Sequence, residues 1–135
     1  MKRRGSTLVE SSVVLLLFLT ILIGVLDFGQ VLFFHHFLMD RVRAGARYAA
    51  VTNPDAATVR NYVAYNNAAP APGTNTLFGL DPAMVVVKRQ DAGTASDRIE
   101  VSISTYRVRF LSPWLAGSFQ PSFTAVMPME SAGGQ

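Results

Sequence analysis

The chain has 135 residues, half of them hydrophobic, which is enough for one small domain and one membrane segment but not for two domains. It contains no cysteine, so disulfides, thiolate metal sites and thiolate catalysis are excluded. The formal net charge of the chain is +3, and the three basic residues Lys2, Arg3 and Arg4 account for all of it. The chain after this basic leader is therefore neutral, which argues against nucleic-acid binding by the rest of the protein.

The N-terminus joins this leader to an apolar run from Val13 to Leu26. Positive charges ahead of a membrane-length segment hold that end in the cytoplasm. The sequence therefore predicts a single-pass protein whose C-terminal domain lies outside the cytoplasm. Glu10 falls where the helix enters hydrocarbon, and an ionisable residue inside a membrane segment is a functional-site hypothesis by default.

A secretory signal peptide has the same basic start and apolar core, so the two interpretations must be separated. A signal peptide should end in small residues at its cleavage site, whereas Gly24–Phe28 offers no such pair. The apolar character also continues to Phe37, beyond the usual length of a signal-peptide core. Both observations favour a helix that stays in the mature protein.

One long helix is expected from Thr7 to about Val51, because this stretch contains no proline and its glycines are isolated, with a bend near Gly24 or Gly29 as an option. At 1.5 Å per residue it would measure about 67 Å, more than twice a hydrocarbon core of about 30 Å. Its first half is expected in the membrane and its second half outside. The expected division is a leader of residues 1–5, a helix of residues 6–51 and an α+β domain of residues 52–135.

The projecting half of this helix is rich in alanine and arginine. Val42, Ala46 and Ala49 recur at helical spacing and predict a small-residue face for close packing, while Arg43 and Arg47 share another face. We expect a cluster of Arg41, Arg43 and Arg47 to be solvated or to contact lipid headgroups. The helix should end before Pro54, because the residue before a proline is disfavoured in the α region.

A short second helix is predicted from about Pro54 to Asn66, with Pro54 in its first turn and an apolar stripe of Val59, Tyr62 and Val63. Residues 68–75 are a loop by composition.

Three strand-like stretches follow, which predict a three-stranded antiparallel sheet with a turn at residues 91–97 between the first two strands. The alternation of the middle stretch changes phase after Ile103, which predicts a bulge near Ser104 or Thr105. Prolines flank the last stretch, as is typical of an edge strand. The three stretches are Met84–Lys88, Arg98–Phe110 and Phe123–Met127.

No pattern of catalytic residues, phosphate-binding loop or metal-ligand set stands out in the sequence. His35 and His36 are adjacent, so they point to different faces of a helix and cannot chelate one metal together. We therefore expect no enzyme activity, no cofactor, no metal and no small-molecule substrate.

The first fifty residues resemble the TadE-like pseudopilins of the tight-adherence (Flp-type) pilus system. Gly5, followed at the fifth position by Glu10 and then by the apolar run, looks like the processing site of a type IV prepilin. The chain departs from the usual pattern at Ala44, where the family more often has glutamate, and at Asp27, where it also favours glutamate. The matching pieces are Val9–Glu10, Leu26–Gly29 and Arg43–Ala49.

The resemblance implies a minor pilin or pseudopilin of the bacterial inner membrane that takes part in assembling an adhesive pilus and is built into it or supports its assembly. A prepilin peptidase would cut after Gly5, so that Ser6 becomes the new N-terminus, and would supply the catalytic carboxylates itself. The implied partners are this peptidase, other pilins, inner-membrane assembly proteins and the lipid bilayer.

Each site residue has a role that follows from its position. Glu10 would neutralise the new Ser6 ammonium of a neighbouring subunit and so fix the register between subunits. Asp27 is expected at the membrane edge. The remaining residues singled out for packing or the membrane edge are Gly45, Arg47 and Tyr48.

Two other function classes stay open. An unprocessed single-pass membrane protein, with a small extracytoplasmic domain that binds a partner, would leave Gly5 uncut. A small secreted or membrane-bound enzyme is disfavoured by the residue inventory.

Overall fold

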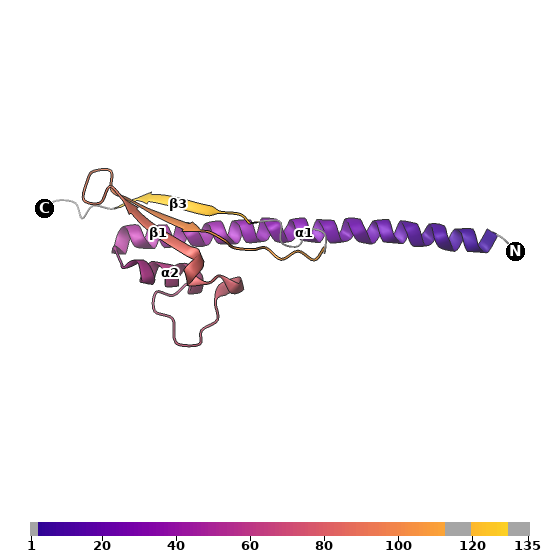
Figure 1. Ribbon diagram of the computed structural model, residues 1–135, viewed down its shortest axis with the longest axis horizontal. Coiled ribbons are helices and arrows are strands. Elements are labelled where there is room, and N and C mark those ends of the chain that lie inside the picture. Colours follow the sequence, from indigo (N-terminus) through magenta and orange to yellow (C-terminus); the bar gives the residue numbers. More distant parts are fainter. Residues whose placement is uncertain (1–2, 113–119, 130–135) are drawn as a thin grey trace. The chain divides into compact units, whose positions relative to one another are not determined.

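The computed structural model describes residues 3–112 and 120–129 (Figure 1). These residues fall into two compact units. The first consists of the chain up to Phe34 together with Val108–Ser112, and the second consists of His35–Arg107 and Gln120–Met129. Each unit is described by itself.

Helix α1 (Arg3–Thr52) is 50 residues long and belongs to both units. The predicted long helix is thereby confirmed, and it stays helical at Gly24 and Gly29. It begins four residues earlier than the sequence predicted. Arginine is a good helix former and a single glycine is tolerated, so nothing in residues 3–6 opposes the helix.

In the second unit, helix α2 (Ala56–Tyr65) has Asp55 as its N-cap. The Asp55 carboxylate accepts hydrogen bonds from the hydroxyl and from the backbone N–H of Thr58, and these bonds lower the pKa of Asp55. The placement of Pro54 in the first turn was wrong, because Pro54 precedes this cap. Asn66 ends the helix in the left-handed conformation, with φ of 58°.

Two short 3₁₀ turns that the sequence did not reveal, η1 (Leu77–Gly79) and η2 (Pro82–Met84), connect the loop to the sheet. The sheet has the predicted antiparallel order β1-β2-β3, so that β3 is an edge strand. Figure 1 shows these strands as the orange and yellow arrows. The strands are β1 (Val85–Gln90), β2 (Arg98–Ile103) and β3 (Phe123–Pro128).

The predicted bulge near Ser104 or Thr105 was wrong. Strand β2 ends at Ile103, and Thr105 has φ of 64°, in the left-handed region that breaks a strand. The change of phase in the sequence therefore marks the end of the strand. Residues 106–112 continue without strand pairing, although Tyr106 and Val108 are buried.

The core of the second unit forms between the second half of α1, helix α2 and one face of the sheet. The small-residue face of α1 is fully buried, as its spacing predicted: Val42, Ala46 and Ala49 are each 0 % exposed. Apolar side chains from the other elements complete the core, namely Val59, Val63, Ala64, Leu80, Val85, Ile99, Val101, Ile103 and Phe123.

Candidate membrane and assembly site

The first half of α1 exposes its apolar side chains. Apart from Ile23, which is half-buried, the large hydrophobic residues from Leu8 to Phe28 are between 43 and 71 % exposed. By length and composition, the helix from Ser6 to Thr52 can cross a membrane; its most apolar window has a mean hydropathy of 2.5 and none of it is buried. Such a surface is costly in water, so it requires lipid or other apolar helices around it.

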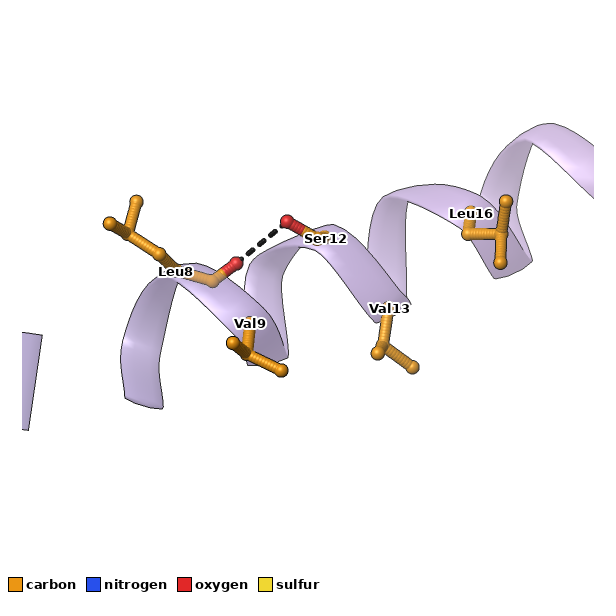
Figure 2. Close-up of a pocket in the computed structure, with 5 residues that line it drawn as sticks. All are labelled: Leu8, Val9, Ser12, Val13 and Leu16. Carbon is orange, nitrogen blue, oxygen red and sulfur yellow. Dashed lines mark hydrogen bonds between the residues drawn. The ribbon is translucent and has the colours of Figure 1, made fainter. Parts of the chain in front are cut away.

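Two hydroxyl groups of this apolar half donate hydrogen bonds to backbone carbonyls of the same helix. The Ser12 hydroxyl donates to the carbonyl oxygen of Leu8 at 2.8 Å, and Thr20 donates in the same way to Leu16. Figure 2 shows Ser12 on one side of the helix together with its apolar neighbours. This surface, lined by Leu8, Val9, Ser12, Val13 and Leu16, therefore brings no unsatisfied hydroxyl into an apolar environment.

The predicted processing residues all lie at the beginning of α1. Gly5 and Ser6 are helical, so the peptide bond between them is inside the first turns of the helix. Ser6 and Glu10 are exposed, and their spacing of four residues places them one above the other on the same face. Glu10 is the only charged residue between Ser6 and Leu26.

Asp27 has partners that the sequence did not reveal. Its side chain is buried, with 2 % exposure, and its two carboxylate oxygens accept the backbone N–H groups of Leu111, at 2.7 Å, and Ser112, at 3.1 Å. All three residues belong to the first unit. One signal could have indicated such a contact, because a lone carboxylate on an apolar helix needs a hydrogen-bonding partner.

Gly45 lies at a close approach between α1 and α2. A Cβ atom added to it would be 2.3 Å from Cγ2 of Val63. Near it, the Tyr48 ring stacks on the Tyr62 ring, with centroids 4.5 Å apart and planes at 11°. Arg47 is exposed, so the motif that contains these residues has a packing face and a solvent face.

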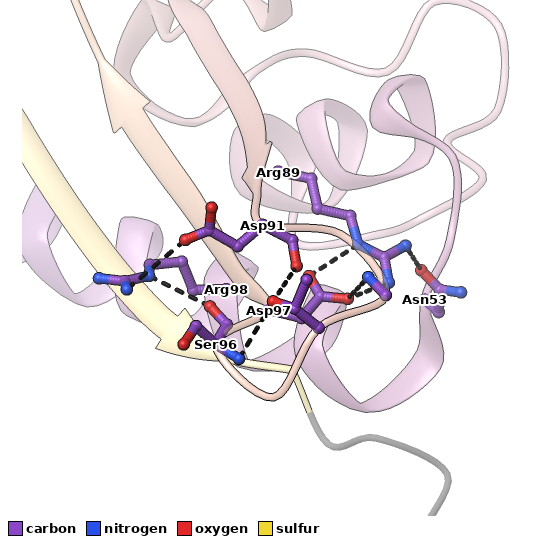
Figure 3. Close-up of polar contacts among 8 residues, drawn as sticks. Asn53, Arg89, Asp91, Ser96, Asp97 and Arg98 are labelled. Atoms are coloured by element: carbon purple, nitrogen blue, oxygen red, sulfur yellow. Dashed lines mark hydrogen bonds and ion pairs between the residues drawn. The ribbon is translucent and has the colours of Figure 1, made fainter.

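A polar cluster joins the β1–β2 turn to the end of α1 (Figure 3). The Arg89 guanidinium donates to both carboxylate oxygens of Asp97, at 3.0 and 2.6 Å, and to the Asn53 side-chain oxygen at 3.1 Å. The Gly93 N–H also donates to Asp97, at 3.0 Å. These donors, Arg89 first, lower the pKa of Asp97 to about 2.

Among residues 3–112 and 120–129, no group of three or more His, Cys, Asp or Glu could hold a metal ion. The His35 ring instead contacts the Phe123 ring edge-on, with centroids 5.4 Å apart.

Comparison with known families gives a match between residues 5–47 and the TadE-like protein family. The N-terminal segment is TadE-like. The resemblance to TadE-like proteins of the tight-adherence pilus system is thereby confirmed over the part of the chain that carries it. No curated protein and no solved structure matches the chain.

The TadE-like segment contains Gly5, Glu10, Asp27, Gly45 and Arg47, and it ends just before Tyr48. Members of this family are structural components of the pilus. They are minor pilins associated with the tight-adherence pilus, and they interact with other pilus components. One long apolar N-terminal helix fits a single-pass membrane pilin of this kind. The sheet and α2 lie outside the matched segment.

Proposed function

We propose that this chain is a minor pilin or pseudopilin that a prepilin peptidase cuts after Gly5, and that takes part in assembling a tight-adherence pilus used for surface adhesion. One observation carries the proposal. The exposed apolar run of α1 has Glu10 as its only charge between Ser6 and Leu26, and it directly follows a basic leader and a glycine. In this role the chain is a substrate of the peptidase and a structural subunit, not an enzyme.

Cleavage requires the Gly5–Ser6 peptide bond to leave the helix, because a protease holds its substrate extended. The beginning of a helix is suited to this, since its first four N–H groups have no intrahelical acceptor and its first turn opens at little cost. Gly5 assists by having no Cβ that would oppose an extended backbone. We therefore infer that the peptidase unwinds only the first turns of α1.

The cut would create an ammonium group at Ser6, one helical turn from Glu10 of the same chain. In a free subunit the two charges can neutralise each other. In an assembly, Glu10 can instead pair with the ammonium of a neighbouring subunit, in surroundings from which water is excluded and where the attraction is stronger. This exchange would favour one axial register between subunits.

The proposed location is the bacterial inner membrane. The three basic residues of the leader favour a cytoplasmic N-terminus, and the small domain after Val51 would then be periplasmic before its assembly into a pilus.

The intact mass of the protein recovered from membranes tests the proposal. Cells with the prepilin peptidase should yield a chain that is lighter by residues 1–5 than the chain from cells without it. A Gly5→Leu variant should stay at full length, whereas Gly24→Ala, placed where an added Cβ meets nothing within 4 Å, should be cut normally. An N-terminus at Met1 in both strains would reject processing and favour the unprocessed single-pass protein.

A further inference from the structure

Residues Val108–Ser112, named the strap here, lie beside α1 in the first unit and contain no helix or strand. Figure 1 shows this orange segment running along the helix. Its last two N–H groups donate to Asp27, which is 84 and 85 residues away in sequence. An 84-residue separation and two simultaneous bonds to one carboxylate make Asp27 the anchor of the strap.

The strap has an inner and an outer side. Val108 and Ser112 are buried, with 3 and 0 % exposure, whereas Arg109 is exposed and Leu111 is 58 % exposed. Phe110 is half-buried, so the side chains that the outer side exposes most are the apolar Leu111 and the cation of Arg109. This combination fits the boundary between acyl chains and phosphate groups of a lipid bilayer.

The depth of Asp27 on the helix agrees with this boundary. Leu17 is the midpoint of the exposed run from Leu8 to Leu26, and Asp27 is ten residues further, or about 15 Å along the axis. Half the thickness of a hydrocarbon core is also about 15 Å. A strap anchored at Asp27 thus lies where hydrocarbon gives way to headgroups.

The anchoring also solves a problem of backbone chemistry. Irregular chain has unpaired N–H groups, and these are costly to bring against an apolar phase. The Asp27 carboxylate accepts hydrogen bonds from two of these N–H groups. The same bonds offset part of the free-energy cost of placing a charged carboxylate at the edge of the membrane.

We propose that the strap is a second lipid-binding element, in which Leu111 inserts at the boundary of the acyl chains and Arg109 pairs with lipid phosphate. The partner is the bilayer, because the surface is continuous with the exposed apolar helix of the same unit and its cation complements a phosphate. This inference rests on the membrane span of the proposed function.

Fluorescent labels at single cysteines test the strap, since the chain has no cysteine of its own. The full chain is placed in phosphatidylcholine vesicles and labelled in separate variants, Leu17→Cys, Leu111→Cys and Val126→Cys, the last on the exposed surface of β3. We expect lipids with a nitroxide deep in the acyl chain to quench the Leu17 label. Lipids with a nitroxide near the headgroup should quench the Leu111 label and blue-shift it, while aqueous iodide alone should quench the Val126 label.

Three outcomes would contradict the proposal, each in a different way. Free quenching of the Leu111 label by iodide, with Leu17 in lipid, overturns the strap alone. A Leu111 label shielded from both lipid and iodide means that protein covers it, and lipid is then the wrong partner. A Leu17 label that lipid does not quench overturns the membrane span together with the strap.

Variants of the anchor and of the cation complete the test. Asp27→Leu should release the strap, so that the Leu111 label loses lipid quenching and gains iodide quenching. The Leu17 label should still be quenched by lipid, and the Val126 label should still be quenched by iodide. Asp27→Asn retains one acceptor oxygen and should give an intermediate loss of lipid quenching at the Leu111 label. This milder variant replaces Asp27→Leu as the test if Asp27→Leu changes the quenching of the Val126 label. Adding phosphatidylglycerol should strengthen the Leu111 quenching, and Arg109→Gln should abolish this gain. Unchanged Leu111 quenching in both Asp27 variants would reject the anchor.

Discussion

Gly45 of α1 and Val63 of α2 are so close that a Cβ atom on the glycine would be 2.3 Å from Cγ2 of the valine. Real Cβ atoms do not approach another heavy atom this closely, so the contact between these helices requires a glycine at this position. Val63 is fully buried and β-branched, which leaves it little freedom to rotate away. The glycine of the TadE-like segment therefore sets how α1 packs on a helix outside that segment.

Gly45→Ala should destabilise the protein. Overpacking of a core typically costs about 1–3 kcal/mol, whereas alanine in place of glycine in a helix gains at most about 1 kcal/mol, so we expect a net loss of about 1 kcal/mol. Urea unfolding of the full chain in detergent micelles, followed by circular dichroism, measures the change.

Gly24→Ala is the matched control, because its Cβ would meet nothing and only the helix-propensity gain remains. Adding Val63→Ala to Gly45→Ala should remove the clash, so the two substitutions together should cost less than the sum of their separate costs. Strictly additive costs would show that the close approach is not the cause.

The Arg89–Asp97 pair should make stability depend on acid pH. The pKa of Asp97 is lowered in the folded protein to about 2 from an ordinary value of 3.8. The contribution of the Asp97 carboxylate to the free energy of unfolding is therefore fully present above about pH 4 and is lost as the pH falls towards 2. Asp97→Asn should be less stable at neutral pH and should lose less of its stability over that acid range, as measured by thermal unfolding at a series of pH values.

The control for this prediction is Asp91→Asn. Asp91 is paired with Arg98 at 3.7 Å in the same turn, but its side chain is 56 % exposed, so its removal should change stability little. If the wild type and Asp97→Asn lose stability in parallel below pH 4, the Arg89 pair is not responsible for the acid dependence.

The sequence predicted the helices and the sheet order because these features depend on local patterns. The spacing of Val42, Ala46 and Ala49 and the prolines around β3 each identify their element without any knowledge of the rest of the chain. The contacts of Asp27 and Arg89 could not be predicted in this way, because their partners are set by the folded chain. The strand end at Ile103 was misread because a bulge and a termination produce the same change of phase in a sequence.

The small domain should lie outside the cytoplasm. The basic leader and the apolar half of α1 together predict this topology, since arginine and lysine resist transfer across the membrane. A fusion of alkaline phosphatase after Gln135, which is active only outside the cytoplasm, should be active, and a fusion of a cytoplasmic reporter at the same place should not. Replacing Lys2, Arg3 and Arg4 by glutamine should weaken the preference. Activity of the cytoplasmic reporter alone would show the reverse topology.

Glu10 should matter for assembly more than for membrane insertion. Glu10→Leu removes the only charge between Ser6 and Leu26, so insertion should become easier. Cleavage after Gly5 should persist, because the scissile bond is more than one helical turn away from Glu10. The variant should lose the charge pairing with a neighbouring Ser6 ammonium, and with it cross-linking to other pilus components, surface pili and adhesion. Glu10→Asp keeps the charge on a shorter side chain and should retain part of each property. Normal cross-linking and piliation by processed Glu10→Leu would mean that the carboxylate only stabilises the beginning of the helix, through the dipole.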